Sequence, residues 1–228
     1  HRVIGVEARR LTRIARGSGQ RREAPGEYGV RVGVLQGGRW VAEAHSEEGA
    51  LEATFACAEK ALALAGLKFA DLRAFAVCVG PGSMLGIRVT AMAVRTWAAL
   101  RPCEVWVWEP LVALAAAVRL RGETSAFSVV SESRLKRWHV VSVDAAGVPG
   151  PTRECEVEQV AVLSGRILTT ADHAPQVLPA AEVVPDVWPE LPRVLAQAGV
   201  LRLEPKPEAL NAAADFATWS GDRHRGTP

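Results

Sequence analysis

A glycine-rich turn stands between an apolar run and a helical pattern in VCVGPGSMLGIRVTAMAVRTWAAL, residues 77–100. Backbone N–H groups at a helix N-terminus lack intrahelical partners, and the helix dipole adds partial positive charge there. Gly80, Gly82 and Ser83 therefore have the types and spacing of a phosphate-binding loop. The alternative is a structural turn, in which the glycines permit the sharp reversal and Ser83 caps the helix. We favour the turn, because a glycine loop without partner residues is a weak motif.

The histidines and cysteines lack the spacing of a catalytic or metal-binding site. The histidines are His1, His45, His139, His173 and His224. No two of them are four residues apart, the spacing that lets two imidazoles on one helix face hold one ion. The four cysteines include no Cys-x-x-Cys pair, so neither a zinc site nor a disulfide framework is indicated. We expect no catalytic residue and no metal.

The composition is that of a globular protein. The chain has 228 residues, of which 49% are hydrophobic, and its formal net charge is +2. This charge alone indicates no nucleic-acid partner. No apolar run approaches the ~20 residues that span a bilayer, so the expectation is a cytoplasmic protein that does not use the membrane.

Positive charge is concentrated near the N-terminus. The first 31 residues contain only three acidic residues, Glu7, Glu23 and Glu27, but eight arginines: Arg2, Arg9, Arg10, Arg13, Arg16, Arg21, Arg22 and Arg31. Residues 11–28 mix Arg, Gly, Ser and Pro without periodicity, which indicates a loop or a hairpin tip. Clustered arginines suit contacts with nucleic-acid phosphates, but a solvated loop explains them equally well. Tyr28 is the first aromatic residue, so base stacking is not indicated.

Hydrophobic periodicity predicts the element order β-β-β-α-β-α-β-α in the first half. Three strands meander first, and strands then alternate with helices, which is typical of a mixed sheet with helices on its faces. The strands are expected at 3–7, 30–35, 40–45, 75–80 and 104–108, and the helices at 47–65, 83–100 and 110–120. Gly66 is expected to end the first helix in a left-handed conformation. This order resembles the ribonuclease-H-like unit that occurs twice in actin-like proteins.

The second half repeats only part of this unit. Strands are expected at 127–131, 138–143 and 166–170, the stretch 148–162 is weakly organised, and helices are expected at 188–198 and 208–220. We therefore predict an N-terminal domain over 1–104 and a shortened, degenerate second domain over 105–207. The last helix, 208–220, is expected to pack back on the first domain.

The two long helices are too apolar for burial on one side only. Glu48, Glu52 and Glu59 form one narrow stripe on the first helix, and Arg88 and Arg95 are the only charges of the second before residue 100. Such faces indicate a partner protein, although a helix of the same chain would also cover them. We assign Leu51, Phe55, Ala58, Leu62 and Ala65 to the sheet. The predicted partner interface is Ala50, Ala53, Cys57, Ala61, Leu64, Ala91, Val94 and Ala98.

Three motifs resemble the TsaB family of proteins that act in tRNA modification. GPGSMLGIR, residues 80–88, resembles the family signature GPGSFTGLR. AHSEEGALE, residues 44–52, resembles its His-Ser-Glu-x-Leu segment, and SESRLKRWHV, residues 131–140, keeps Arg134 of a third motif. The sequence differs from the family pattern in two places at the phosphate site. Glu7 replaces the usual Asp and has no hydroxyl residue after it, and Met84 and Leu85 replace Phe-Thr.

The resemblance implies an actin-like, two-domain α/β fold and a non-catalytic scaffold subunit. Such a subunit supports threonylcarbamoyl transfer to adenosine of tRNA by pairing with a TsaD-type paralogue through the two long helices. A TsaE-type ATPase is a further implied partner. The chain alone would form a homodimer, and it would contact tRNA only through the complex. No cofactor is implied, with weak ATP or ADP binding left open. The alternatives are an ATP-dependent enzyme that uses residues 80–83 and a homodimer with another task.

We expect the purified chain to neither hydrolyse ATP nor bind a catalytic metal, because the Asp-hydroxyl pair and a His-x-x-x-His motif are missing. Elemental analysis and an ATPase assay check this. Stoichiometric zinc or iron, or ATP turnover that disappears in Ser83→Ala, would contradict it.

Overall fold

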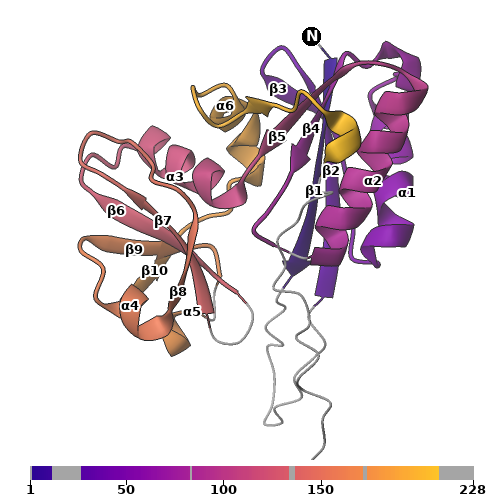
Figure 1. The fold of residues 1–228 in the computed structure, drawn as a ribbon. Coiled ribbons are helices and arrows are strands. Elements are labelled where there is room, and N and C mark those ends of the chain that lie inside the picture. Colours follow the sequence, from indigo (N-terminus) through magenta and orange to yellow (C-terminus); the bar gives the residue numbers. More distant parts are fainter. Residues whose placement is uncertain (1, 12–26, 83, 134–136, 172–173, 211–228) are drawn as a thin grey trace, which may run out of the picture.

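The chain forms two β-sheets that are both flanked by helices (Figure 1). The computed structural model describes residues 2–11, 27–82, 84–133, 137–171 and 174–210. The first sheet has six strands in the order β11-β5-β4-β1-β2-β3, and the second has five in the order β10-β9-β6-β7-β8. The expected mixed α/β architecture is confirmed.

The first sheet joins an antiparallel meander to two parallel strands. The meander is β1 (Arg2–Leu11), β2 (Glu27–Gln36) and β3 (Arg39–Ser46). Gly37 and Gly38, at φ +62° and +76°, make the tight turn between β2 and β3, a conformation that favours glycine. Parallel to β1 run β4 (Ala74–Cys78) and then β5 (Glu104–Trp108), and β11 (Arg202–Leu203) pairs antiparallel with β5.

Two helices, α1 (Ala50–Leu64) and α2 (Met84–Leu100), pack side by side against the first sheet (Figure 1). The predicted end of α1 is confirmed, because Gly66 has φ +64°. The N–H of Leu67 donates to the carbonyl of Leu62 at 3.0 Å, which closes the helix with the bond typical of a glycine C-terminus. The single-turn 3-10 helix η1 (Phe69–Asp71) then leads into β4.

Helix α3 (Pro110–Leu120) packs between the two sheets. Ala113 and Ala117 pack with Ala76 and Trp108 of the first sheet, whereas the opposite side of α3 packs on β6 and β7. The second sheet consists of β6 (Phe127–Glu132), β7 (Arg137–Val143), β8 (Arg153–Glu156), β9 (Arg166–Thr169) and β10 (Ala181–Val183). Its other face is covered by the short helices α4 (Val157–Ala161) and α5 (Ala174–Val177).

Several expectations about the second half need correction. The helix expected at 188–198 is a 3-10 turn, η2 (Trp188–Glu190), followed by the five-residue α6 (Leu191–Leu195). A proline lies in the first turn of each, where it can start a helix but not continue one. The stretch 148–162 contains β8 and α4. Of the helix expected at 208–220, only η3 (Pro207–Ala209) and Leu210 are described. Residues 12–26 of the expected loop also lie outside the described residues.

The chain leaves the first sheet after β5, which starts at the predicted domain boundary, and returns to it as β11. Among the described residues, no helix has both the length and the apolar character to cross a membrane.

A tryptophan joint, formed by Arg31, Trp40, Glu43, Asp186 and Trp188, fixes this returning segment to the first sheet. The rings of Trp40 and Trp188 stack with centroids 4.9 Å apart. Nε1 of Trp40 donates to the carbonyl of Trp188 at 3.0 Å, and Nε1 of Trp188 donates to Oε2 of Glu43 at 2.6 Å. Arg31 pairs with Asp186 and lies over the Trp188 ring. The joint therefore ties β2 and β3 to a segment about 150 residues away.

Glycine at position 33 makes room for this joint, because a Cβ there would lie 2.7 Å from the Trp40 ring. We expect Gly33→Ala to lower the free energy of unfolding by about 1–3 kcal/mol, the usual cost of overpacking. The same substitution in a Trp40→Leu background should cost clearly less. Chemical denaturation of the four proteins measures the coupling. Equal costs in both backgrounds would show that the ring does not set the requirement for glycine.

Candidate functional site

The glycine turn between β4 and α2 is shaped by backbone conformation and by packing. Gly80 has φ +96°, and a Cβ at this position would lie 2.7 Å from Cδ1 of Ile87. The N–H of Val79 donates to the carbonyl of Trp108 at 3.0 Å, which holds the start of the turn against β5. Both observations account for glycine at position 80 through structure alone.

The phosphate-loop hypothesis stays a prediction. Gly82 is exposed, with Cδ1 of Ile87 3.9 Å from its would-be Cβ, and Ser83 lies outside the described residues. The structure therefore brings Gly80 and Gly82 to the start of α2, next to the side chain of Ile87.

Titratable residues are dispersed in the part of the chain that the structure describes. No three His, Cys, Asp or Glu side chains there are grouped closely enough to hold a metal ion. His45 is exposed on β3 of the first sheet, whereas His139 lies on β7 of the second. Burial lowers the pKa of His139, and the nearby Glu154 opposes that shift. The other three histidines lie outside the described residues.

The described thiols whose pKa is shifted are poor nucleophiles. Burial raises the pKa of the Cys57 thiol, and it also raises the pKa of the Cys103 thiol. Both thiols are therefore protonated near neutral pH, and the thiolate is the reactive form.

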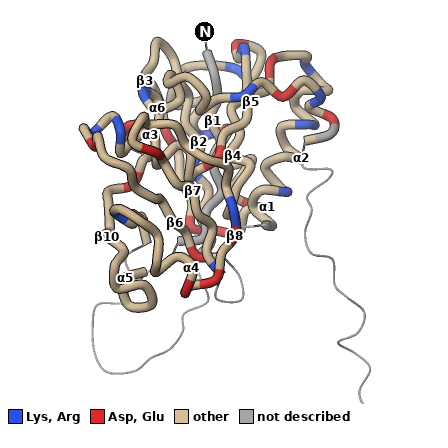
Figure 2. The backbone as a smooth tube through the Cα atoms, turned by 60° about the vertical axis from the view of Figure 1, so that its left-hand side comes forward, with Lys and Arg blue, Asp and Glu red and all other residues tan. Residues whose placement is uncertain are grey.

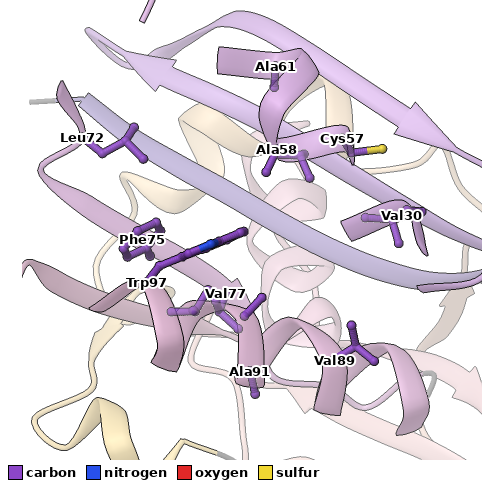
Figure 3. Packing of buried hydrophobic residues seen from close by; sticks show 14 of the residues in the cluster. Val30, Cys57, Ala58, Ala61, Leu72, Phe75, Val77, Val89, Ala91 and Trp97 are labelled. Atoms are coloured by element: carbon purple, nitrogen blue, oxygen red, sulfur yellow. The ribbon is translucent and has the colours of Figure 1, made fainter. Parts of the chain in front are cut away.

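The predicted orientation of α1 and α2 is wrong for most of the residues concerned, although Ala58, Leu62 and Ala65 do pack on the core as expected. Most of the residues assigned to the partner interface pack inward in the core of the first sheet: Ala50, Ala53, Cys57, Ala61, Ala91 and Val94 are buried, and Ala98 is partly buried against the same core. Figure 3 shows Cys57, Ala61 and Ala91 among this packing. Of the predicted set, Leu64 is exposed.

Small side chains explain the reversal, because they let a helix axis approach its neighbours closely. Leu51 and Phe55, which were expected to face the sheet, are exposed instead, although large apolar side chains gain most from burial. The acidic stripe was the better signal. Glu52 and Glu59 mark the solvent side of α1, and the buried Ala50 and Ala61 lie opposite them on the helix.

The outward side of the two helices is an apolar surface, which we name the helix face. It consists of large side chains with exposed fractions between 40% and 78%: Leu51, Phe55, Leu64, Leu85, Met92 and Leu100. Exposed charged residues accompany them, with Glu52 and Glu59 on α1 and Arg88 and Arg95 on α2. Apolar surface of this kind, flanked by charges, is typical of a protein interaction site.

A groove of about 350 Å³ lies beside the helix face and is lined by Phe55, Leu62, Phe69, Trp97 and neighbouring residues. The Trp97 ring meets Phe55 edge-on, with centroids 5.6 Å apart, and lies 5.4 Å from Phe69. It also stacks on the buried Phe75 at 5.6 Å. The aromatic wall is therefore fixed to the core. Sequence reasoning missed Phe69, because it lies in η1, outside both helices.

Comparisons with known proteins agree with this architecture. Residues 41–131, which include α1, the glycine turn and α2, match the family model described as TsaD: tRNA N6-adenosine threonylcarbamoyltransferase. A comparison with curated proteins gave no match.

Two solved structures from Pseudomonas aeruginosa have a similar fold. One is YeaZ, with a TM-score of 0.61 and 16% identity, covering 86% of this chain and 89% of that chain. The other is an uncharacterized protein with similarity to peptidase YeaZ, with a TM-score of 0.60 and 16% identity, covering 87% and 93%. YeaZ is the TsaB protein. The chain therefore has the fold of YeaZ, which is the expected actin-like fold, and its residues 41–131 are similar to the TsaD family.

Proposed function

We propose that this chain is a non-catalytic partner subunit in the formation of threonylcarbamoyladenosine on tRNA. In this role it presents the helix face to a TsaD-type paralogue and holds that enzyme in a productive arrangement. The observation that carries the proposal is the helix face itself, because six large apolar side chains are exposed on two helices whose small side chains already fill the sheet side. The description of the matching family and the fold shared with YeaZ support a role in tRNA modification.

Burial of the helix face supplies part of the free energy that a stable complex needs. Full burial of a Leu, Phe or Met side chain is worth ~1.5–3 kcal/mol. The six residues are on average a little more than half exposed, so docking would gain roughly 5–10 kcal/mol. Association itself costs an amount of similar size. A partner must therefore cover most of the helix face, and charge complementarity must add to the binding.

The charges define which partner fits. Glu52 and Glu59 make the α1 side acidic, and Arg88 and Arg95 make the α2 side basic. A paralogue with basic residues opposite α1 and acidic residues opposite α2 would be selected over one with the reverse pattern. A second copy related by a two-fold axis has the same complementarity, which supports a homodimer when the chain is alone.

The remaining components join through the complex. A TsaE-type ATPase and tRNA would meet this subunit only in the assembly with the paralogue. The subunit itself would use no cofactor and work in the cytoplasm.

The proposal is tested by charges placed on the helix face. Leu51 and Met92 are exposed in the monomer, so water solvates the new carboxylate of Leu51→Glu or Met92→Glu. Arg88 and Arg95, one turn from position 92, also offset the charge there. In a complex these carboxylates must be desolvated, which costs several kcal/mol. We expect association to weaken more than tenfold for each variant, as measured by sedimentation with the paralogue and alone, with an unchanged melting temperature.

Two variants serve as controls. Val162 is even more exposed than Leu51 and Met92 but lies near the second sheet, after α4, so Val162→Glu should associate like the wild type. Ala53→Glu buries a charge under α1, where the exposed fraction is 0%, and should unfold the chain. Wild-type affinity in both helix-face variants would contradict the proposed role of this surface.

A further inference from the structure

The groove beside the helix face combines aromatic side chains with one carboxylate. Among its lining residues, all of which the structure describes, Glu59 is the charged one, and the others are apolar: Phe55, Ala58, Leu62, Ala63, Leu67, Phe69 and Trp97. Glu59 is exposed on α1, and no residue in the described part of the chain forms a hydrogen bond or an ion pair with its carboxylate. The groove therefore offers an aromatic wall and an unpaired negative charge.

The aromatic wall is held in place before anything binds. The Trp97 ring stacks on the buried Phe75 (Figure 3). The guanidinium of Arg101 donates to the backbone carbonyls of Phe69 and Leu72 at 3.2 and 3.0 Å, which fixes η1 beside the ring, and Arg101 does not line the groove. A wall that is already ordered loses little conformational freedom on binding.

The occupant of the groove must suit both the rings and the carboxylate. A purely apolar side chain would cover the rings, but it would also take water away from Glu59 without giving it a partner, which is costly for a charged group. A side chain with an apolar stem and a cationic end covers the rings and pairs with the carboxylate. Arginine fits better than lysine, because its planar guanidinium stacks on aromatic rings, binds a carboxylate in a bidentate manner and is less strongly hydrated.

The attraction for a cation is local to Glu59. Charged positions of both signs are interspersed along the described backbone (Figure 2), and the net charge of the whole chain is only +2. Glu52 lies two turns away on the same side of α1 and does not line the groove. The two carboxylates therefore differ in whether an occupant of the groove would cover them.

We propose that the groove receives an arginine side chain of the TsaD-type paralogue and that Glu59 pairs with its guanidinium. The identity of the partner rests on the proposed function, whereas the chemistry of the occupant rests on the residues of the groove. Phe55 belongs to both the groove and the helix face, so one partner surface covers the two together. Arginine is among the residues that most often dominate the binding energy of an interface.

Dissociation of the complex with the paralogue tests the role of Glu59. Glu59→Gln removes the charge and keeps the shape, and its control is Glu52→Gln. Loss of one partner from a desolvated ion pair speeds dissociation, whereas loss of a charge at a solvated rim mainly slows association. By surface plasmon resonance, we expect Glu59→Gln to raise the dissociation rate more than about tenfold and Glu52→Gln to change it less than about twofold.

A second pair of variants tests occupancy of the groove. Ala63→Leu enlarges an exposed lining residue, and Ala56→Leu makes the same change at an exposed position of α1 outside the groove. We expect Ala63→Leu to weaken binding of the paralogue and Ala56→Leu to keep the wild-type affinity. Each exposed arginine of the paralogue is then replaced by lysine. One replacement should weaken binding to the wild-type chain but not to Glu59→Gln.

The outcomes separate this inference from the proposed function. If Ala63→Leu weakens binding but Glu59→Gln dissociates like the wild type, the occupant is an apolar side chain and the inference is overturned. Absence of any paralogue arginine that couples to Glu59 would also overturn it, and the proposed pairing would stand if Leu51→Glu still weakens association. If helix-face variants associate normally while Glu59→Gln dissociates faster, the proposed docking on the helix face is wrong and the groove inference stands.

Discussion

The close packing of small side chains under α1 and α2 determines which side chains these helices expose. Ala53, Cys57 and Ala61 of α1, and Ala91 and Val94 of α2, lie against the first sheet. Because these side chains are short, the helices lie low on the sheet, and the large residues at other positions are left outside. The helix face is therefore a consequence of how the core is filled. A chain that filled the same core with leucines would hold its helices further from the sheet.

Two anchors keep the helix face in place. Below it, Trp97 is packed among Phe55, Phe69 and Phe75, which connects α1, α2, η1 and β4 in one aromatic cluster. On the other face of the first sheet, the tryptophan joint fixes the segment that returns from the second sheet. Helix α3 packs on both sheets and joins them. The helix face thus lies on the core between the first sheet and its two long helices.

Local sequence patterns predict the elements well but not their orientation. β5 and α3 have the expected bounds, because each begins with a charged residue or proline and is mainly apolar beyond it. Most of the residues predicted to face outward on α1 and α2 face inward instead, since two apolar stripes on one helix cannot be ranked by spacing alone. The stacking of Trp40 on Trp188 was not predictable, because it joins residues far apart in sequence. The glycine-rich motif identifies Gly80 as a turn residue, whereas no local sequence pattern connects Phe69 with Trp97.

The central claim is that the helix face docks a TsaD-type paralogue. Hydrogen–deuterium exchange of the chain at concentrations below self-association, with and without the paralogue, tests this most directly. When the paralogue is present, we expect slower exchange in peptides that span α1, η1 and α2, and unchanged exchange in peptides of β6 to β10. Protection confined to the second sheet, or no protection in α1 and α2 under conditions where the two proteins bind, would contradict it.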